Sequence, residues 1–230
     1  MRRSYAIHVL LGLVGVCSLA ALAHAADSPP APRPIINVTN IATDSSKYGW
    51  LTDDGRKGLD SAVAKFKAGS LAAYVFAAAP GGDFWSYQSQ SKATDFISIE
   101  DLARQSLQVC EYYASSPCYV VSVNGFDARD ANGGLQIQPS MLADQPTEFD
   151  PSRAPFTVAS DFTKLNGYLP VTKAKAFVVD TDGAWWWEQA DDSGEAATMA
   201  YADCKKDNKD NVCILYAVNN RVVLTPGGPY

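Results

Sequence analysis

The chain is 230 residues long, with 19 basic and 25 acidic residues and a formal net charge of −6. An acidic balance of this kind disfavours binding to nucleic acid and to an anionic membrane surface. The sequence contains two histidines, His8 and His24, and both fall within the first 25 residues.

The first 25 residues have the pattern of a secretory signal peptide. A basic start is followed by an apolar run from Ile7 to Leu22 and by Ala23-His24-Ala25, an A-x-A cleavage site. The run is shorter than the roughly 20 residues of a membrane span. We expect cleavage to leave a periplasmic or secreted chain without a membrane span. Since residues 1–25 carry two arginines and no acidic residue, its net charge is −8. Without histidine, Ser-His-Asp and Cys-His mechanisms and histidine metal sites are excluded.

The next elements in chain order are a tether, a helix, a hairpin, a second helix and a strand. Residues 26–40 begin with a proline-rich stretch and are predicted to form an extended tether. After Thr52, an apolar stripe formed by Leu59, Val63 and Phe66 predicts the first helix. Residues 72–79 followed by Pro80-Gly81-Gly82 predict a hairpin. A capping box of Ser98 and Asp101 begins a helix that ends at Cys110, and residues 118–124 predict a strand.

The second part of the chain repeats this order. A weaker apolar stripe of Phe162, Leu165 and Leu169 precedes a hairpin that turns at Thr181-Asp182-Gly183. A helix capped by Asp192 then ends at Cys204, and residues 213–219 predict a strand. We therefore predict an α+β fold of two pseudo-repeated α-β-β-α-β units with mostly antiparallel sheet. The first unit covers residues 41–125, a connecting segment covers 126–156, and the second unit covers 157–230.

Four cysteines lie outside the signal segment, namely Cys110, Cys118, Cys204 and Cys213. An even number of cysteines in an exported chain indicates disulfides. A four-cysteine zinc site is the alternative, but its ligands usually lie two to four residues apart. Each unit has one cysteine at a helix end and one at the start of the next strand. We therefore predict the pairs Cys110–Cys118 and Cys204–Cys213, with no metal and no cofactor.

Three consecutive tryptophans, residues 185–187, form the most conspicuous candidate site. Alignment of the two units on Gly82 and Gly183 makes Trp186 the equivalent of Trp85 and Trp187 the equivalent of Ser86. Because neighbouring strand residues face opposite sides of a sheet, we expect Trp186 to face the helices of its unit. Trp185 and Trp187 then face the other side, where they pack between units or meet a ligand such as a sugar ring. Packing is the commoner role for large aromatic residues, and Trp187 is the main candidate for binding.

Paired carboxylates offer a catalytic alternative, because they can hydrolyse glycosides without histidine. The candidate pairs are Glu188 with Asp191 or Asp192, and Glu100 with Asp101, although Asp101 and Asp192 also have capping roles. The stretch from Asp180 to Gly183 has the start of a calcium loop but lacks the later ligands, which favours a hairpin turn.

The second unit resembles small exported bacterial modules of largely uncharacterised function, with the pattern K-A-F-A…G-x-W…A-L-x-x-C…C-x-L-Y-A-V. The matching residues here are 175–178, 182–185, 196–204 and 213–223. The resemblance implies an exported bacterial protein and no catalytic residues. We expect a non-catalytic binding or structural protein of the cell envelope that engages a glycan or another exported protein. The alternatives are a hydrolase that uses paired carboxylates and an inhibitor or immunity-type partner of another exported protein.

Overall fold

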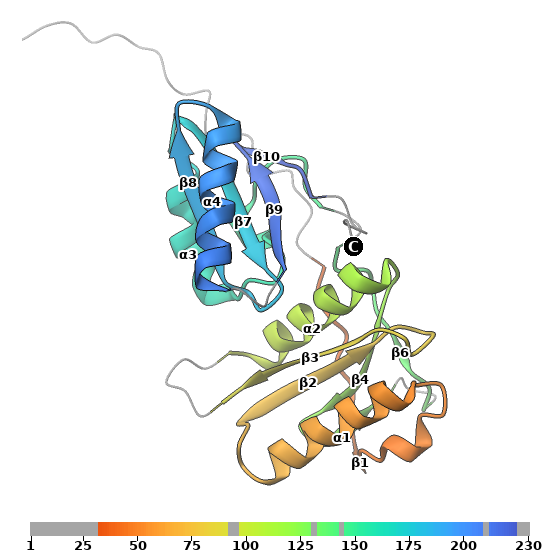
Figure 1. Cartoon of the computed structure of the whole chain (residues 1–230). Helices are drawn as coiled ribbons and strands as arrows, with labels where there is room; N and C mark the ends of the chain where they lie inside the picture. The colour runs from red at the N-terminus through yellow and green to blue at the C-terminus, as the bar shows by residue number, and fades with distance from the viewer. Residues whose placement is uncertain (1–31, 92–96, 130–132, 143–144, 209–211, 225–230) are drawn as a thin grey trace, which may run out of the picture. The chain divides into compact units, whose positions relative to one another are not determined.

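A computed structural model describes residues 32–91, 97–129, 133–142, 145–208 and 212–224 (Figure 1). The predicted signal peptide, residues 1–25, and the first part of the predicted tether lie outside the described residues. Contacts divide the chain into Met1–Pro30 and Ala31–Tyr230, so both predicted repeat units belong to one compact unit. Helices and antiparallel sheets alternate along this unit, which confirms the predicted α+β class.

The first sheet contains six strands and has a helix on each face. Its strands, in spatial order, are β1 (Val38–Ala42), β5 (Phe126–Ala128), β4 (Tyr119–Val123), β2 (Ala73–Ala78) and β3 (Trp85–Gln90), with β6 (Gln136–Ile137) also paired to β4. Helix α1 (Asp53–Lys67) packs on the face that carries Tyr74 and Phe76, and α2 (Ile99–Ala114) on the face that carries Val75 and Ala77 (Figure 1). Strand β1 begins inside the range 26–40 that we expected to be a tether.

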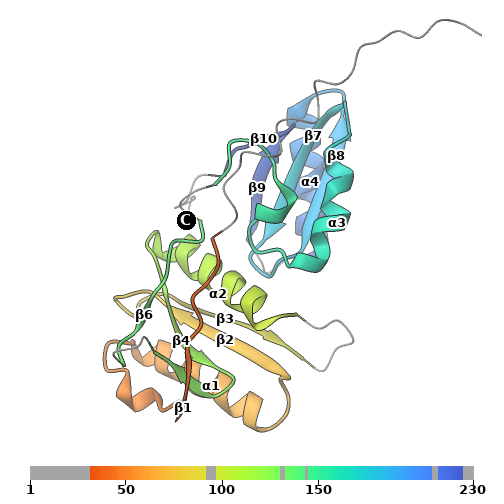
Figure 2. The same cartoon turned by 180° about the vertical axis from the view of Figure 1, so that it is seen from behind.

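The second sheet contains four strands, in the order β10 (Arg221–Val222), β9 (Cys213–Val218), β7 (Ala174–Asp180) and β8 (Trp185–Ala190). Helix α4 (Ser193–Asp207) covers one face, and the four-residue α3 (Phe162–Leu165) lies on the other (Figure 2). Short 3-10 turns occur at residues 45–47, 151–153, 159–161 and 166–168. Helices α2 and α4 have the predicted caps, because Ser98 accepts the Asp101 N–H and Asp192 accepts the Glu195 N–H.

The two sheets repeat the same strand register, which supports the predicted duplication. Phe76 in β2 lies between Tyr87 and Ser122, and Phe177 in β7 lies between Trp187 and Ala217. In both sheets the register shifts directly after this phenylalanine. The turn after the next strand is also shared: Asn124 and Asn219 have φ values of 51° and 53°. Each asparagine side chain accepts a backbone N–H of the central strand, from Tyr74 at 2.8 Å and from Lys175 at 3.2 Å.

Both predicted disulfides are present. Cys110 pairs with Cys118 across eight residues, and Cys204 pairs with Cys213 across nine. Each bond joins the last part of a helix to the start of the following strand, so it holds the helix on its sheet.

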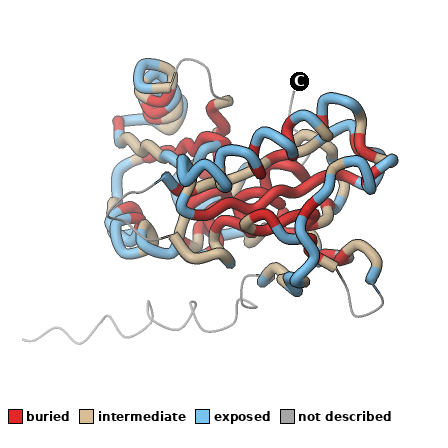
Figure 3. Tube along the Cα trace, turned by 90° about the horizontal axis from the view of Figure 1, so that it is seen from below, coloured by how far each residue is buried: buried red, intermediate tan, exposed pale blue. Residues whose placement is uncertain are grey.

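Helix α2 is buried on two sides. Its apolar residues Ala103, Leu107 and Cys110 pack on the first sheet, whereas Val109 and Tyr112 belong to the core that contains Phe177. Most of α2, all of the central strand β2 and all but the first residue of the central strand β7 are buried. Figure 3 shows the buried parts of the chain in red. The polar residues between these apolar positions are also buried, and Gln105, Gln108 and Glu111 among them bind the main chain of the connecting segment.

Candidate functional site at the edge of the second sheet

Strand β8 forms an edge of the second sheet, since β7 is the only strand among the described residues that pairs with it. The backbone N–H and C=O groups of Lys175 in β7 both form hydrogen bonds with Asn219, on the β9 side of the strand. The Asp180 N–H instead donates to the Ala184 carbonyl, on the β8 side. In an antiparallel pair such groups alternate, so the even-numbered residues of β7 bind the even-numbered residues of β8. Trp185, Trp187 and Gln189 therefore turn their backbone N–H and C=O groups outward, where no described strand pairs with them. The Gln189 N–H also binds the neighbouring Glu188 carboxylate.

The two predicted binding residues, Trp185 and Trp187, lie together on one face of β8. Trp185 is stacked on Phe177, with ring centroids 6.1 Å apart and planes at 16°. Trp187 meets the Tyr168 ring edge-on, with centroids 5.9 Å apart. Both indoles are half-buried in the aromatic core of the second unit. Packing thus occupies one side of each ring, and the remaining surface lies beside the outward-facing backbone.

The predicted correspondence between tryptophans of the two units is wrong by one residue. Trp85 pairs with Ala78, and Trp185 pairs with Val179, the residue equivalent to Ala78. The first hairpin loop is one residue longer than the second, so alignment on Gly82 and Gly183 shifts the strands that follow.

The corrected register changes which tryptophan lacks an aromatic counterpart. Trp85 corresponds to Trp185, and both stack on the central phenylalanine of their sheet. Tyr87 corresponds to Trp187, and Ser86 corresponds to Trp186. The indole that the repeat does not require is therefore Trp186, and not Trp187 as we predicted.

Trp186 lies on the opposite face of β8, as expected, against α4. It packs on the cluster of Val178, Ala200 and the Cys204–Cys213 disulfide while remaining half-exposed. Its indole N–H donates to the Asp207 carboxylate at 3.1 Å. The last turns of α4 therefore place acidic groups beside β8.

The carboxylate pair that the structure brings together differs from the predicted pairs. Glu188 faces Asp203 of α4 within hydrogen-bonding reach, and burial, followed by the Asp203 carboxylate, raises the pKa of Glu188 above its usual value. Asp191 instead lies 3.7 Å from Lys173. The sequence did not indicate Asp203, because a strand and a helix residue 15 positions apart meet only when α4 folds back over β8.

The other predicted carboxylates have structural roles. Asp192 caps α4, and Asp101 accepts from Ser98 and lies 3.6 Å from the Arg104 guanidinium. Asp180 accepts the N–H groups of Asp182 and Ala184 at 3.0 and 2.8 Å, as the hairpin-turn interpretation predicts. In the described part of the chain, no group of three or more acidic or cysteine side chains is placed to hold a metal ion.

A buried lysine supports the aromatic side of β8. The Lys175 ammonium donates to the carbonyls of Tyr168, Leu169 and Val171 at 2.6, 3.0 and 2.9 Å. Burial lowers the pKa of this ammonium. Lys175 thus fixes the turn that presses Tyr168 against Trp187, which is a structural role.

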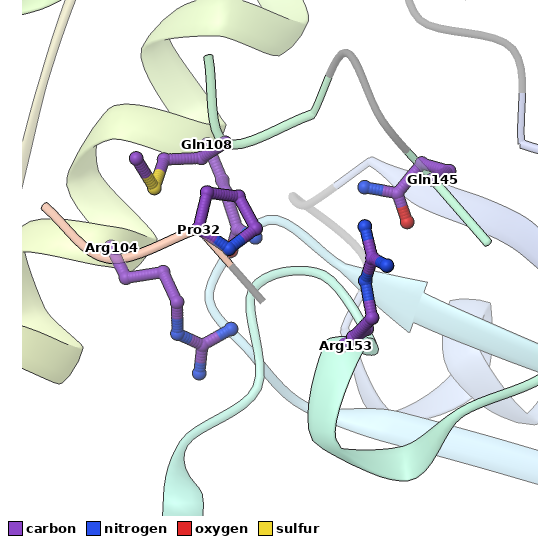
Figure 4. A pocket seen from close by; sticks show the side chains of 6 residues that line it. Pro32, Arg104, Gln108, Gln145 and Arg153 are labelled. Carbon is purple, nitrogen blue, oxygen red and sulfur yellow. The ribbon is translucent and has the colours of Figure 1, made fainter. Parts of the chain in front are cut away.

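A small cavity beside α2 is also lined by charged side chains. Pro32, Arg104, Gln108, Met141, Gln145 and Arg153 surround a cavity of about 10 Å³ (Figure 4). This is the space of about one water molecule, too small for a substrate. Arg104 binds the Thr157 carbonyl, and Gln108 accepts the Phe156 N–H at 2.7 Å, so these side chains hold the connecting segment.

Comparison with protein-family models, with curated proteins and with solved structures finds no match. The resemblance of the second unit to exported bacterial modules therefore stays a prediction. No helix among the described residues is long and apolar enough to cross a membrane.

Proposed function

We propose that the protein is an exported, non-catalytic binding protein of the bacterial cell envelope, and that it binds an extended segment of a protein partner as an additional strand on β8. The observation that carries this proposal is the outward-facing backbone of Trp185, Trp187 and Gln189. A row of unpaired N–H and C=O groups is a template for a further strand. The half-buried Trp185 and Trp187 add apolar surface for alternate side chains of that strand.

The other sheet edges carry features that block strand addition. At β10, the Phe149 N–H binds the Asn220 carbonyl, and Glu148 is bridged to Arg221. At β1, the register is irregular and the Ile41 N–H binds its neighbour Thr39. Bulges and covering segments of this kind protect sheet edges. Strand β8 has a continuous register with β7 and contains no proline or lysine.

Edge β3 is the equivalent of β8 and gives a matched comparison. Its residues are mainly serine and glutamine, and the Lys65 ammonium binds the Tyr87 hydroxyl beside this edge at 3.0 Å. A lysine at an edge is a common guard against strand addition. Trp85 and Tyr87 give β3 aromatic residues at the positions of Trp185 and Trp187, and the Lys65 contact with Tyr87 therefore distinguishes the two edges.

The carboxylate hydrolase is less well supported. Retaining and inverting glycosidases separate their carboxyl groups by about 5 Å or more, whereas Glu188 and Asp203 are within hydrogen-bonding reach. Neither residue lines the cavity beside α2.

Proline substitution at outward-facing backbone positions tests the proposal. Gln189→Pro removes an outward N–H without breaking the β7–β8 ladder, and Ser89→Pro makes the same change at the equivalent position of β3. The ligand is a short blocked peptide of alternating threonine and valine, long enough to span β8. We expect wild type and Ser89→Pro to bind it, and Gln189→Pro to lose binding while keeping its melting temperature. Equal binding by all three proteins, or by none, would overturn strand addition on β8.

A further inference from the structure

The α4 side of β8 is acidic. Trp186 and Glu188 point to this side from the strand, and Asp203 and Asp207, one helical turn apart, approach from α4. Among the described residues, no ion pair with lysine or arginine involves Glu188, Asp203 or Asp207. Lys205, two residues from both Asp203 and Asp207, lies over the Tyr201 ring at 5.9 Å.

Two carboxylates in contact are unfavourable when both are ionised, because like charges repel and each loses hydration. The raised pKa of Glu188 reflects this environment. A cation placed beside the pair would remove the repulsion. The exposed part of the Trp186 ring, which lies two residues before Glu188 on the same face, would add a cation–π contact.

A strand added at the edge of β8 has only certain places for its side chains. Residues directly opposite each other on neighbouring strands have Cβ atoms about 5 Å apart on the same face. One side chain of the added strand would therefore lie beside Glu188 and the next on that face beside Trp186. The side chains of the partner strand that lie on the α4 side would therefore contact Glu188 and Trp186, and these contacts would determine which sequence binds.

We propose that the partner strand carries a lysine or arginine at the position beside Glu188, where its charge meets Glu188 and Asp203. This inference rests on the proposed strand addition and specifies the chemistry of the partner. The first unit offers no such site, since Ser86 and Gln88 occupy the positions of Trp186 and Glu188. Ser86 is moreover buried beneath α2.

Three peptides that differ only in the central residue test the inference. The alternating threonine–valine peptide carries lysine, glutamine or glutamate at its centre, and its affinity is measured at low and high salt. We expect the lysine peptide to bind about three- to tenfold more tightly than the glutamine peptide at low salt, and the glutamate peptide to bind least tightly. The preference should shrink as salt screens the charges.

Two double variants test whether the preference for lysine arises from Glu188 and Asp203. Glu188→Gln combined with Asp203→Asn should bind all three peptides with similar affinity. Asp191→Asn combined with Glu195→Gln removes the same charge from the N-terminal end of α4 and should keep the preference for lysine.

The outcomes separate the two proposals. Equal affinity of wild type for the three peptides, with the outward N–H groups of β8 protected in each complex, would overturn the basic residue and leave strand addition standing. A lysine preference that survives loss of Glu188 and Asp203 would also overturn it. Absence of binding by every peptide would overturn strand addition, and the present inference with it.

Discussion

Glu111 on α2 is the side chain whose replacement tests the packing of the connecting segment most directly. It is 4% exposed. Its carboxylate accepts the N–H groups of Met141 and Leu142 at 2.8 and 2.9 Å and the Ser140 hydroxyl at 3.0 Å. All three bonds go to Oε2, and the Met141 N–H also lies 3.1 Å from Oε1. In Glu111→Gln an amide NH₂ takes the place of one of these oxygens and faces the buried Met141 N–H, so part of this hydrogen bonding is lost. The cost of such a loss is about 1–3 kcal/mol.

The pH dependence of this effect has a definite sign. Burial raises the pKa of Glu111, although the hydrogen bonds from residues 140–142 act in the opposite direction. A carboxyl group with a raised pKa contributes most to stability below its ordinary pKa, and the contribution falls as pH rises through the folded value. The stability difference between wild type and Glu111→Gln should therefore be larger near pH 4 than near pH 7.

Chemical denaturation of both proteins at several pH values measures this difference, because other titrating groups cancel between them. For a chain of this size, the expected loss near neutral pH corresponds to a melting temperature lower by about 2–10 °C. Glu100→Gln, an exposed change in the first turn of α2, serves as the control and should change stability little. A stability difference that grows with rising pH would refute the reasoning, since it would mean that hydrogen bonding outweighs burial and lowers the Glu111 pKa.

Two further predictions concern the repeat and the edge strand. Replacing Cys204 and Cys213 by alanine should destabilise the protein by about 2.5 kcal/mol in the chain-entropy model. Replacing Cys110 and Cys118 should give nearly the same loss in a denaturant titration, since the two disulfide loops span nine and eight residues. Clearly unequal losses would show that the two bonds do not play equivalent roles. In amide hydrogen exchange of the unliganded protein, Trp186 and Glu188 should be protected, whereas Trp185 and Trp187 should exchange rapidly. Protection of Trp185 and Trp187 would mean that the edge is already covered.

Short sequence patterns predicted much of the secondary structure, because caps and turns depend on residues that are close together in the chain. The caps Ser98 and Asp192 and the glycine turns fix boundaries that the structure contains. The predicted helix ends at Cys110 and Cys204 are too early, because α2 continues to Ala114 and α4 to Asp207. The duplication then gave the disulfide pairing, because two copies of one arrangement must use the same bond.

The failures arose where the argument needed distances between segments. A hairpin loop that is longer by one residue reverses the side to which each following side chain points, which explains the misassignment of Trp186 and Trp187. The pairing of Glu188 with Asp203 depends on how α4 lies over β8. The buried polar face of α2 carried a signal, since Arg104, Gln108 and Glu111 follow helical spacing, but an exposed face has the same pattern.

The burial of α2 explains why the two units, so alike in register, differ at their edges. In the first unit the helix above the hairpin is covered on its far side by the connecting segment, through Gln108 and Glu111. The side chains beneath it, such as Ser86, are accordingly small. In the second unit α4 has an exposed outer face with Met199 and Tyr201, and the edge beside it carries Trp186 and Glu188. The first copy thus packs against the connecting segment, and the second carries the acidic strand edge that we propose as the partner-binding site.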